Sequence, residues 1–149
     1  KIEYAKSINI GGVRILDACG QDLQKIIALC EEKVDEFNVI PSVKYYGIGG
    51  TATSIASVLQ QLTVYDVNKV HGFKLTAKKV DEAIRLFASK TVEERKNIVG
   101  LQPDRADVIL GATVLLSVIM KRFSMPEVIV SEDDNLEGYL YLKEVKNEQ

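Results

Sequence analysis

KYYGIGGTATSIASVLQQL, residues 44–62, decides the fold, because it joins a β-prone run to a helix-compatible apolar pattern through two adjacent glycines. A strand that ends at Gly49 and Gly50 and turns into a helix leaves several backbone N–H groups in the open. The positive end of the helix dipole lies at the same place, and this arrangement suits a phosphate. The alternative is that the glycines only allow strand and helix to pack closely, with Thr51 as the N-cap.

Length indicates one domain over residues 1–149, of which 46% are hydrophobic, and the intermixed strands and helices described below make it an α/β domain. The 19 basic and 21 acidic residues give a net charge of −2 and form no basic stripe, so the sequence argues against nucleic-acid binding. Cys19 and Cys30 lack metal-ligand spacing. One disulfide between them stays open, but the pattern favours a reducing, cytoplasmic setting, with Cys30 as a small core residue.

No segment is long enough to span a membrane. The longest apolar stretch, residues 108–120, has 13 residues, whereas a spanning helix needs about 20. This stretch is therefore predicted to be a buried core helix. The chain begins without methionine, inside the alternating pattern of residues 1–4, which favours a piece of a longer protein.

Hydrophobic periodicity predicts intermixed strands and helices, and therefore a mixed sheet with helices packed on it. Thr76 is predicted to be an N-cap, and Thr91 and Glu94 form a capping box. Strands are predicted at 2–10 and 13–17 (two strands or one bent strand with a bulge), at 43–48, at 127–130 and at the end of the connector 63–75. Helices are predicted at 21–37, 51–62, 76–89, 91–98, 104–123 and 136–145.

Arg105 is a candidate functional residue, because it follows Pro103 in the run GLQPDRAD at residues 100–107. In the structural interpretation, Asp104 and Asp107 complement a helix dipole and Arg105 pairs with one of them. In the functional interpretation, Arg105 projects into a cleft and contacts a phosphate or a carboxylate of a partner domain. The sequence alone favours the structural role.

Three further features are weaker candidates. His71 is the only histidine and lies in a connector, where it is either structural or a phosphate contact. Arg14 beside the Gly-Gly pair at 11–12 is either a phosphate contact or an ordinary edge-strand charge. The acids at 132–134 are interpreted as a solvated turn rather than a metal site. No complete nucleophile set, zinc motif or phosphate loop is present, so no catalytic residue is assigned.

Several segments together resemble the exopolyphosphatase / guanosine pentaphosphate phosphohydrolase (Ppx/GppA) family. The most specific parts are the Gly-Gly-Thr-x-Thr-Ser helix start and the Gly-Leu-x-Pro-x-Arg-Ala-Asp run. The match runs in order from about residue 7 to 140. Its segments are SINIGGVRI (7–15), GIGGTATSIASVLQ (47–60), LTVYDVNKVHGFKLT (62–76), TVEERKNIVGLQPDRADVILGA (91–112) and VIVSEDDNLEG (128–138).

The resemblance implies a ribonuclease-H-like domain of the actin/Hsp70/sugar-kinase superfamily, the second of two domains with the active site between them. It also implies release of phosphate from inorganic polyphosphate or guanosine pentaphosphate with Mg²⁺. By matching position, Gly49, Gly50 and Thr51 would line the phosphate cleft, with Arg14, His71 and Arg105 nearby. We expect the metal ligands mostly outside this chain.

Two features of that family are missing. They are the amino-terminal domain with the catalytic glutamate, and the Asp-x-Gly-Gly-Gly-Ser strand that would open the second domain. We therefore expect a fragment that is truncated at its first strand, inactive alone and completed by an N-terminal domain of the same chain, with a homodimer as a further option. The alternatives are a non-catalytic sensor of polyphosphate or guanosine tetraphosphate and a kinase domain of the same superfamily.

Overall fold

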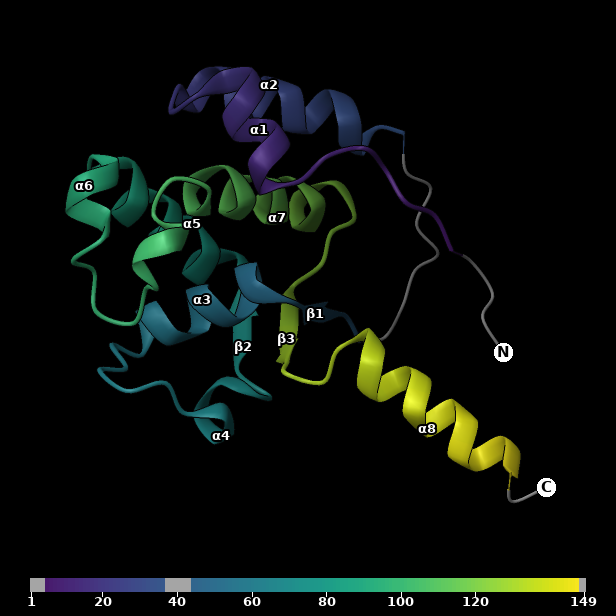
Figure 1. Cartoon of the computed structure of the whole chain (residues 1–149). Coiled ribbons are helices and arrows are strands. Elements are labelled where there is room, and N and C mark those ends of the chain that lie inside the picture. The colour runs from purple at the N-terminus through teal and green to yellow at the C-terminus, as the bar shows by residue number, and fades with distance from the viewer. Residues whose placement is uncertain (1–4, 37–43, 148–149) are drawn as a thin grey trace.

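The chain folds into a small mixed sheet with helices packed on it (Figure 1). The computed structural model describes residues 5–36 and 44–147. Three short strands are distributed among the helices of the described residues. The elements are α1 (Gly12–Cys19), α2 (Leu23–Val34), β1 (Tyr46–Ile48), α3 (Gly50–Leu59), α4 (Val67–Val70), β2 (Lys74–Thr76), α5 (Ala77–Ala88), α6 (Val92–Arg95), the 3-10 helix η1 (Pro103–Arg105), α7 (Ile109–Arg122), β3 (Glu127–Ser131) and α8 (Asn135–Asn147).

Three strands in the described residues form the sheet in the order β1-β3-β2. β1 pairs with β3 in parallel, with Gly47 opposite Val130, and β2 pairs with β3 antiparallel, with Leu75 opposite Val128. A parallel pair needs a long crossover, which α3, α5 and α7 supply between β1 and β3. The mixed sheet predicted from the sequence is therefore confirmed.

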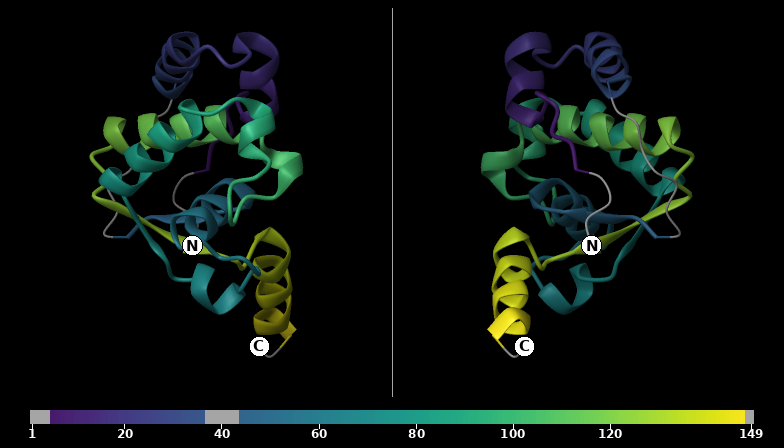
Figure 2. Two further views of the ribbon diagram at one scale, coloured as in Figure 1. Left: turned by 90° about the vertical axis from the view of Figure 1, so that its left-hand side faces the viewer. Right: turned by 90° about the vertical axis from the view of Figure 1, so that its right-hand side faces the viewer.

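Helix α7 is the centre of the core. Figure 2 shows α1 and α2 on one side of α7 and the sheet with α3 on the other. Nearly every residue in the first half of α7 is buried, because this helix contacts α1, α2, α3 and α5. This explains why its sequence is apolar on nearly all sides. The buried residues of α7 are Ile109, Leu110, Gly111, Ala112, Thr113, Val114, Ser117 and Met120.

The strand predicted at 13–17 is wrong, because these residues belong to helix α1. No strand is present at 5–11 either, and residues 2–4 lie outside the described part of the chain. The side chain of Ile15 is fully buried against α7, where the Cβ of an alanine at Gly111 would lie 2.6 Å from it. The apolar residues of this segment fit the period of a helix as well as that of a strand, and packing on α7 selects the helix.

The helix predicted over 104–123 begins later than expected, at Ile109. Residues 103–105 form η1 instead, and a turn follows. Side chains from elsewhere in the chain bond to the carbonyl oxygens of Ala106 and Asp107, which an extended helix would use for its own hydrogen bonds. The observed helix α7 therefore starts five residues later than the periodicity predicts.

Helix caps follow the predictions at two places. The Thr76 hydroxyl accepts from the Lys79 N–H at 3.3 Å, and Thr91 and Glu94 form the complete capping box. Cys30 is buried as predicted, and burial raises the pKa of its thiol to about 11. Both cysteines are free thiols, so the disulfide that the sequence left open is not formed.

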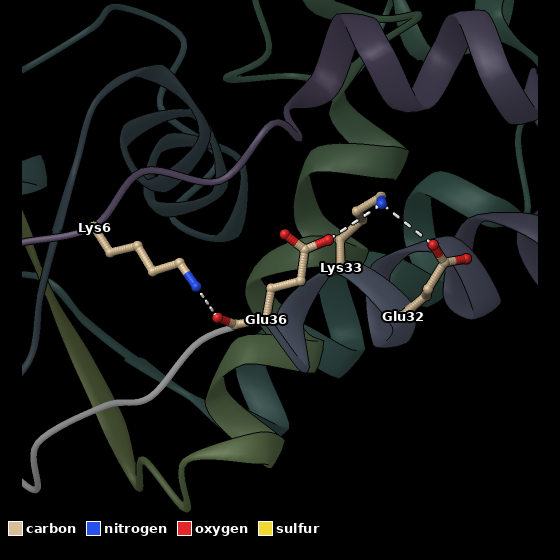
Figure 3. Close-up of polar contacts among 4 residues, drawn as sticks. All are labelled: Lys6, Glu32, Lys33 and Glu36. Carbon is tan, nitrogen blue, oxygen red and sulfur yellow. Dashed lines mark hydrogen bonds and ion pairs between the residues drawn. The ribbon is translucent and has the colours of Figure 1, made fainter.

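Exposed polar contacts join the segment before α1 to the end of α2 (Figure 3). The Lys6 ammonium donates to the Glu36 backbone carbonyl, and Lys33 forms ion pairs of 3.2 Å with both Glu32 and Glu36. The hydrogen bonds from Lys33 to these two carboxylates raise its pKa. Exposed pairs of this kind contribute little to stability.

Helix α8 extends away from the rest of the chain in Figures 1 and 2. Its exposed apolar residues include Leu136, Tyr139 and Leu140. Asp134 begins this helix by accepting from the Leu136 N–H at 2.6 Å, and this bond lowers the pKa of its carboxyl. Within the described residues, no helix has the length and apolar character needed to cross a membrane.

Candidate functional site

The first turn of α3 has no side-chain cap. Gly49 is the N-cap residue, with φ of 92°, and the helix begins at Gly50 rather than after a Thr51 cap, so that prediction is wrong. An L residue rarely adopts this φ, and no atom lies within 4 Å of the place where a Cβ on Gly49 would stand. The turn therefore leaves the first N–H groups of α3 without a side-chain acceptor, at the positive end of the helix dipole.

Close packing of strand and helix depends on a different glycine. A Cβ on Gly47 would lie 2.9 Å from Val128 and 3.2 Å from Ala52, so Gly47 lets β1, β3 and α3 meet.

At Gly50 the neighbour is the guanidinium of Arg105. A Cβ there would lie 2.0 Å from its Nη1 and 2.4 Å from its Cζ. Gly50 therefore makes room for a cation at the start of α3.

Arg105 is held over Gly50 by its own short loop. Its Nε donates to the Gln102 Oε1 at 3.0 Å, and the structure shows no ion pair of Arg105 with Asp104 or Asp107 among the described residues. The ion pair between Arg105 and one of these two aspartates, which the structural interpretation predicted, is therefore not observed. Two independent sources of positive potential, a guanidinium and a helix N-terminus, meet at this point.

Gly100 brings this loop against α3. Its φ is +88°, and a Cβ would lie 2.5 Å from the Ser57 carbonyl oxygen and 2.9 Å from the Val58 backbone nitrogen. The loop thus contacts α3 at two places. Gly100 lies against the helix two turns after its start, and Arg105 lies against its first turn. This double approach sets where the guanidinium lies.

Tyr65, Glu132 and His71 form a polar chain on the neighbouring side. The Tyr65 hydroxyl donates to a carboxylate oxygen of Glu132, and the Glu132 backbone N–H donates to the His71 Nδ1 at 3.3 Å. Burial, together with the bond to Glu132, raises the pKa of Tyr65 to about 12, against lowering contributions from Thr53 and the Arg105 charge.

The raised pKa of Tyr65 gives a pH prediction. Stability that depends on the neutral phenol is fully present below the unfolded pKa of 10.0 and is lost as the pH rises toward about 12, because only the unfolded chain ionises in that window. Phenolate absorbance at 295 nm, compared between the wild type and Tyr65→Phe, should give a difference titration with a midpoint near pH 12. A midpoint near 10.0 would show that the phenol is not held by Glu132.

Comparison with known proteins agrees with this architecture. The model of the Ppx/GppA phosphatase family matches residues 1–147. The chain belongs to this family. A bifunctional 3-dehydroquinate synthase/phosphatase of Fusobacterium nucleatum is 33% identical over 98% of the chain, and an exopolyphosphatase 2 of Mycobacterium tuberculosis is 24% identical over 89%. The chain spans only 23% and 46% of the lengths of these two relatives.

Solved structures of the Ppx/GppA phosphatase family show the same fold. The family member from Aquifex aeolicus superposes with a TM-score of 0.92 at 24% identity, over 100% of this chain and 51% of that one. A second Aquifex aeolicus structure, of a PPX-GPPA enzyme, gives 0.86 at 27% identity over 94% of this chain and 49% of that one. The actin-like ATPase fold expected from the resemblance is therefore confirmed.

The structure brings together most of the residues singled out in the sequence. Gly49, Gly50, Thr51 and Arg105 form one cluster at the start of α3, whereas His71 belongs to the polar chain with Glu132 and Tyr65. Arg14 is exposed on α1, and no contact of the described residues joins it to the cluster. Their roles in binding stay predictions.

Sequence reasoning missed three residues, one that bonds to Arg105 and two of the polar chain with His71. Gln102 orients Arg105, and its place in the Gly-Leu-Gln-Pro run was a usable signal. Tyr65 and Glu132 meet across 67 positions of sequence, and no spacing rule predicts that pair. In the part of the chain that is described, no group of three or more His, Cys, Asp or Glu side chains could hold a metal ion. The donors gathered at the start of α3, backbone N–H groups and a guanidinium, are groups that suit an anion.

Proposed function

We propose that this chain forms one side of the phosphate-binding cleft of a hydrolase that cleaves terminal phosphoanhydride bonds in inorganic polyphosphate or guanosine pentaphosphate. The proposal depends on one observation, the Arg105 guanidinium at the uncapped first turn of α3 beside Gly50. Backbone N–H groups and a guanidinium are the donors that phosphate oxygens require. Membership in the Ppx/GppA phosphatase family supports the reaction class.

The catalytic base is expected from another domain of the same protein. Chemistry at a phosphoanhydride needs a carboxylate that activates water and a metal that offsets charge. Within 5–36 and 44–147 no group of three or more His, Cys, Asp or Glu side chains could hold a metal ion, so the metal ligands are expected mostly outside this chain. We assign no Mg²⁺ ligand and no catalytic residue to this chain. The N-terminal domain, a homodimer and a cytoplasmic setting stay predictions.

Two assays test the proposed function. The chain should bind inorganic polyphosphate in calorimetry, with an affinity that falls as salt rises, but release no phosphate. The full-length protein with Mg²⁺ should release it. Binding without release by the full-length protein would favour the sensor alternative. Transfer of labelled phosphate from ATP to an acceptor would favour the kinase alternative. No binding by either protein would overturn the proposal.

Gly50→Ala separates stability from binding. The new Cβ displaces the flexible end of Arg105. The affinity for polyphosphate should therefore fall roughly three- to tenfold, because the displaced guanidinium keeps only part of the binding free energy of a hydrogen bond to a charged group. The free energy of unfolding should change little, because Gly50 is the first residue of α3 and the atoms that must move are the end of a flexible side chain. Gly138→Ala in α8 is the matched control, because no atom lies within 4 Å of its Cβ position. Unchanged affinity in Gly50→Ala would show that this corner does not hold the substrate.

A further inference from the structure

Arg95 is a buried cation, only 2% exposed, in the capping-box helix α6. Its guanidinium donates to three neutral oxygens. Nε bonds to the Phe87 carbonyl at 2.7 Å, and Nη1 bonds to the Gln21 Oε1 at 2.6 Å and to the Ala106 carbonyl at 3.2 Å. No carboxylate of the described residues forms an ion pair with it. Burying a charge costs free energy because the charge loses its hydration, and these three hydrogen bonds offset part of that cost.

Gln21 extends this arrangement by one more bond. Its Oε1 accepts from Arg95, and its Nε2 donates to the Asp107 carbonyl at 2.9 Å. Arg95 and Gln21 therefore hold two consecutive carbonyl groups, those of Ala106 and Asp107. These carbonyls directly follow Arg105, whose guanidinium lies at Gly50.

A competing conformation explains why these bonds matter. In a longer α7, the carbonyls of Ala106 and Asp107 would accept from the N–H groups four residues later. The sequence itself favours that longer helix, as the prediction over 104–123 shows. The observed helix instead starts with the bond from the Ala112 N–H to the Val108 carbonyl, at 3.1 Å. Residues 103–105 instead form a 3-10 helix, which turns by about 120° per residue against about 100° in an α-helix, so extension of α7 would move the Arg105 side chain relative to Gly50.

We propose that Arg95 and Gln21 are positioning residues: they hold the Ala106 and Asp107 carbonyls outside α7 and thereby keep Arg105 at the anion site. This inference rests on the proposed function, in which Arg105 binds phosphate. Gly100 fixes the other end of the same loop against α3. The two ends together determine the place of the guanidinium.

The test uses the exposed member of the pair, because a change at buried Arg95 risks unfolding the chain. Gln21→Met removes both hydrogen bonds at similar side-chain size. We expect the affinity for inorganic polyphosphate, measured by calorimetry at fixed salt, to fall roughly three- to tenfold, as for other coupled neighbours. Gln24→Met, an exposed glutamine of α2, is the matched control and should leave the affinity unchanged.

A double-mutant cycle distinguishes positioning from a general structural role. In the Arg105→Ala background, Gln21→Met should have no further effect on binding, because the residue that it positions is gone. An equal loss in both backgrounds, or an unchanged affinity of Gln21→Met alone, would overturn the inference while leaving the proposed function intact. Failure of the wild-type chain and the full-length protein to bind polyphosphate would overturn both.

Discussion

Gly100→Ala is expected to lower the free energy of unfolding by about 3 kcal/mol or more, the largest stability change that we predict. Two causes add. Alanine is strained at φ of +88°, and its Cβ would lie 2.5 Å from the Ser57 carbonyl oxygen and 2.7 Å from the Ser57 carbonyl carbon. Backbone atoms inside α3 cannot move aside as a side chain can. The loop must therefore leave α3, and urea denaturation would measure the loss.

Gly72→Ala is the matched control for this prediction. Its φ is +78°, similar to that of Gly100, but no atom lies within 4 Å of its Cβ position. It should therefore show only the backbone strain, about 1 kcal/mol. Equal losses in the two variants would mean that the contact between Gly100 and Ser57 contributes nothing to stability. The displaced loop in Gly100→Ala should also weaken polyphosphate binding, because the loop carries Arg105.

Arg105→Ala is expected to weaken polyphosphate binding roughly 10- to 100-fold, the effect of losing a hydrogen bond to a charged group worth about 1.5–3 kcal/mol. The salt dependence of the remaining affinity should also become shallower, because one cation fewer contacts the polyanion. Arg105→Lys should recover part of the loss, since lysine keeps the charge but not the planar fork. Calorimetric titration at several salt concentrations measures all three.

Arg85→Ala is the control for charge alone. Arg85 is exposed at the end of α5 and lines a surface hollow with Ile27 and Val114, on the side of α7 that faces α2. Removing it lowers the net charge of the chain by the same amount. An equal loss of affinity in Arg85→Ala would mean that polyphosphate responds to overall charge and that Arg105 forms no specific contact.

Elements with local signals were predicted well. The Gly-Gly unit, the capping box at Thr91 and the apolar strand β3 depend on residues within a few positions of one another, and the structure has all three. Local caps and turns act over one helical turn, so a single sequence is enough to identify them. The sequence also singled out Gly50 and Arg105, and the family resemblance implied that they lie near each other.

The errors occurred where packing overrides local preference. The segment at 13–17 has apolar residues that fit a strand, but Ile15 packs on α7 and makes it a helix. The segment at 104–108 has a helical pattern, but Arg95 and Gln21 bond to its carbonyls and keep it out of α7. Both outcomes depend on residues far away in sequence, which periodicity does not include.

The sequence by itself determined the parts of the site. Glycine at position 49 is required for the positive φ, and the apolar pattern that follows requires a helix there, so the uncapped helix start is a local property. Only the tertiary structure decided that Arg105 meets it. That contact needs the loop to pack on α3 at Gly100 and to accept the hydrogen bond from Arg95 at the Ala106 carbonyl. A guanidinium on a flexible side chain has no fixed place until its backbone is fixed.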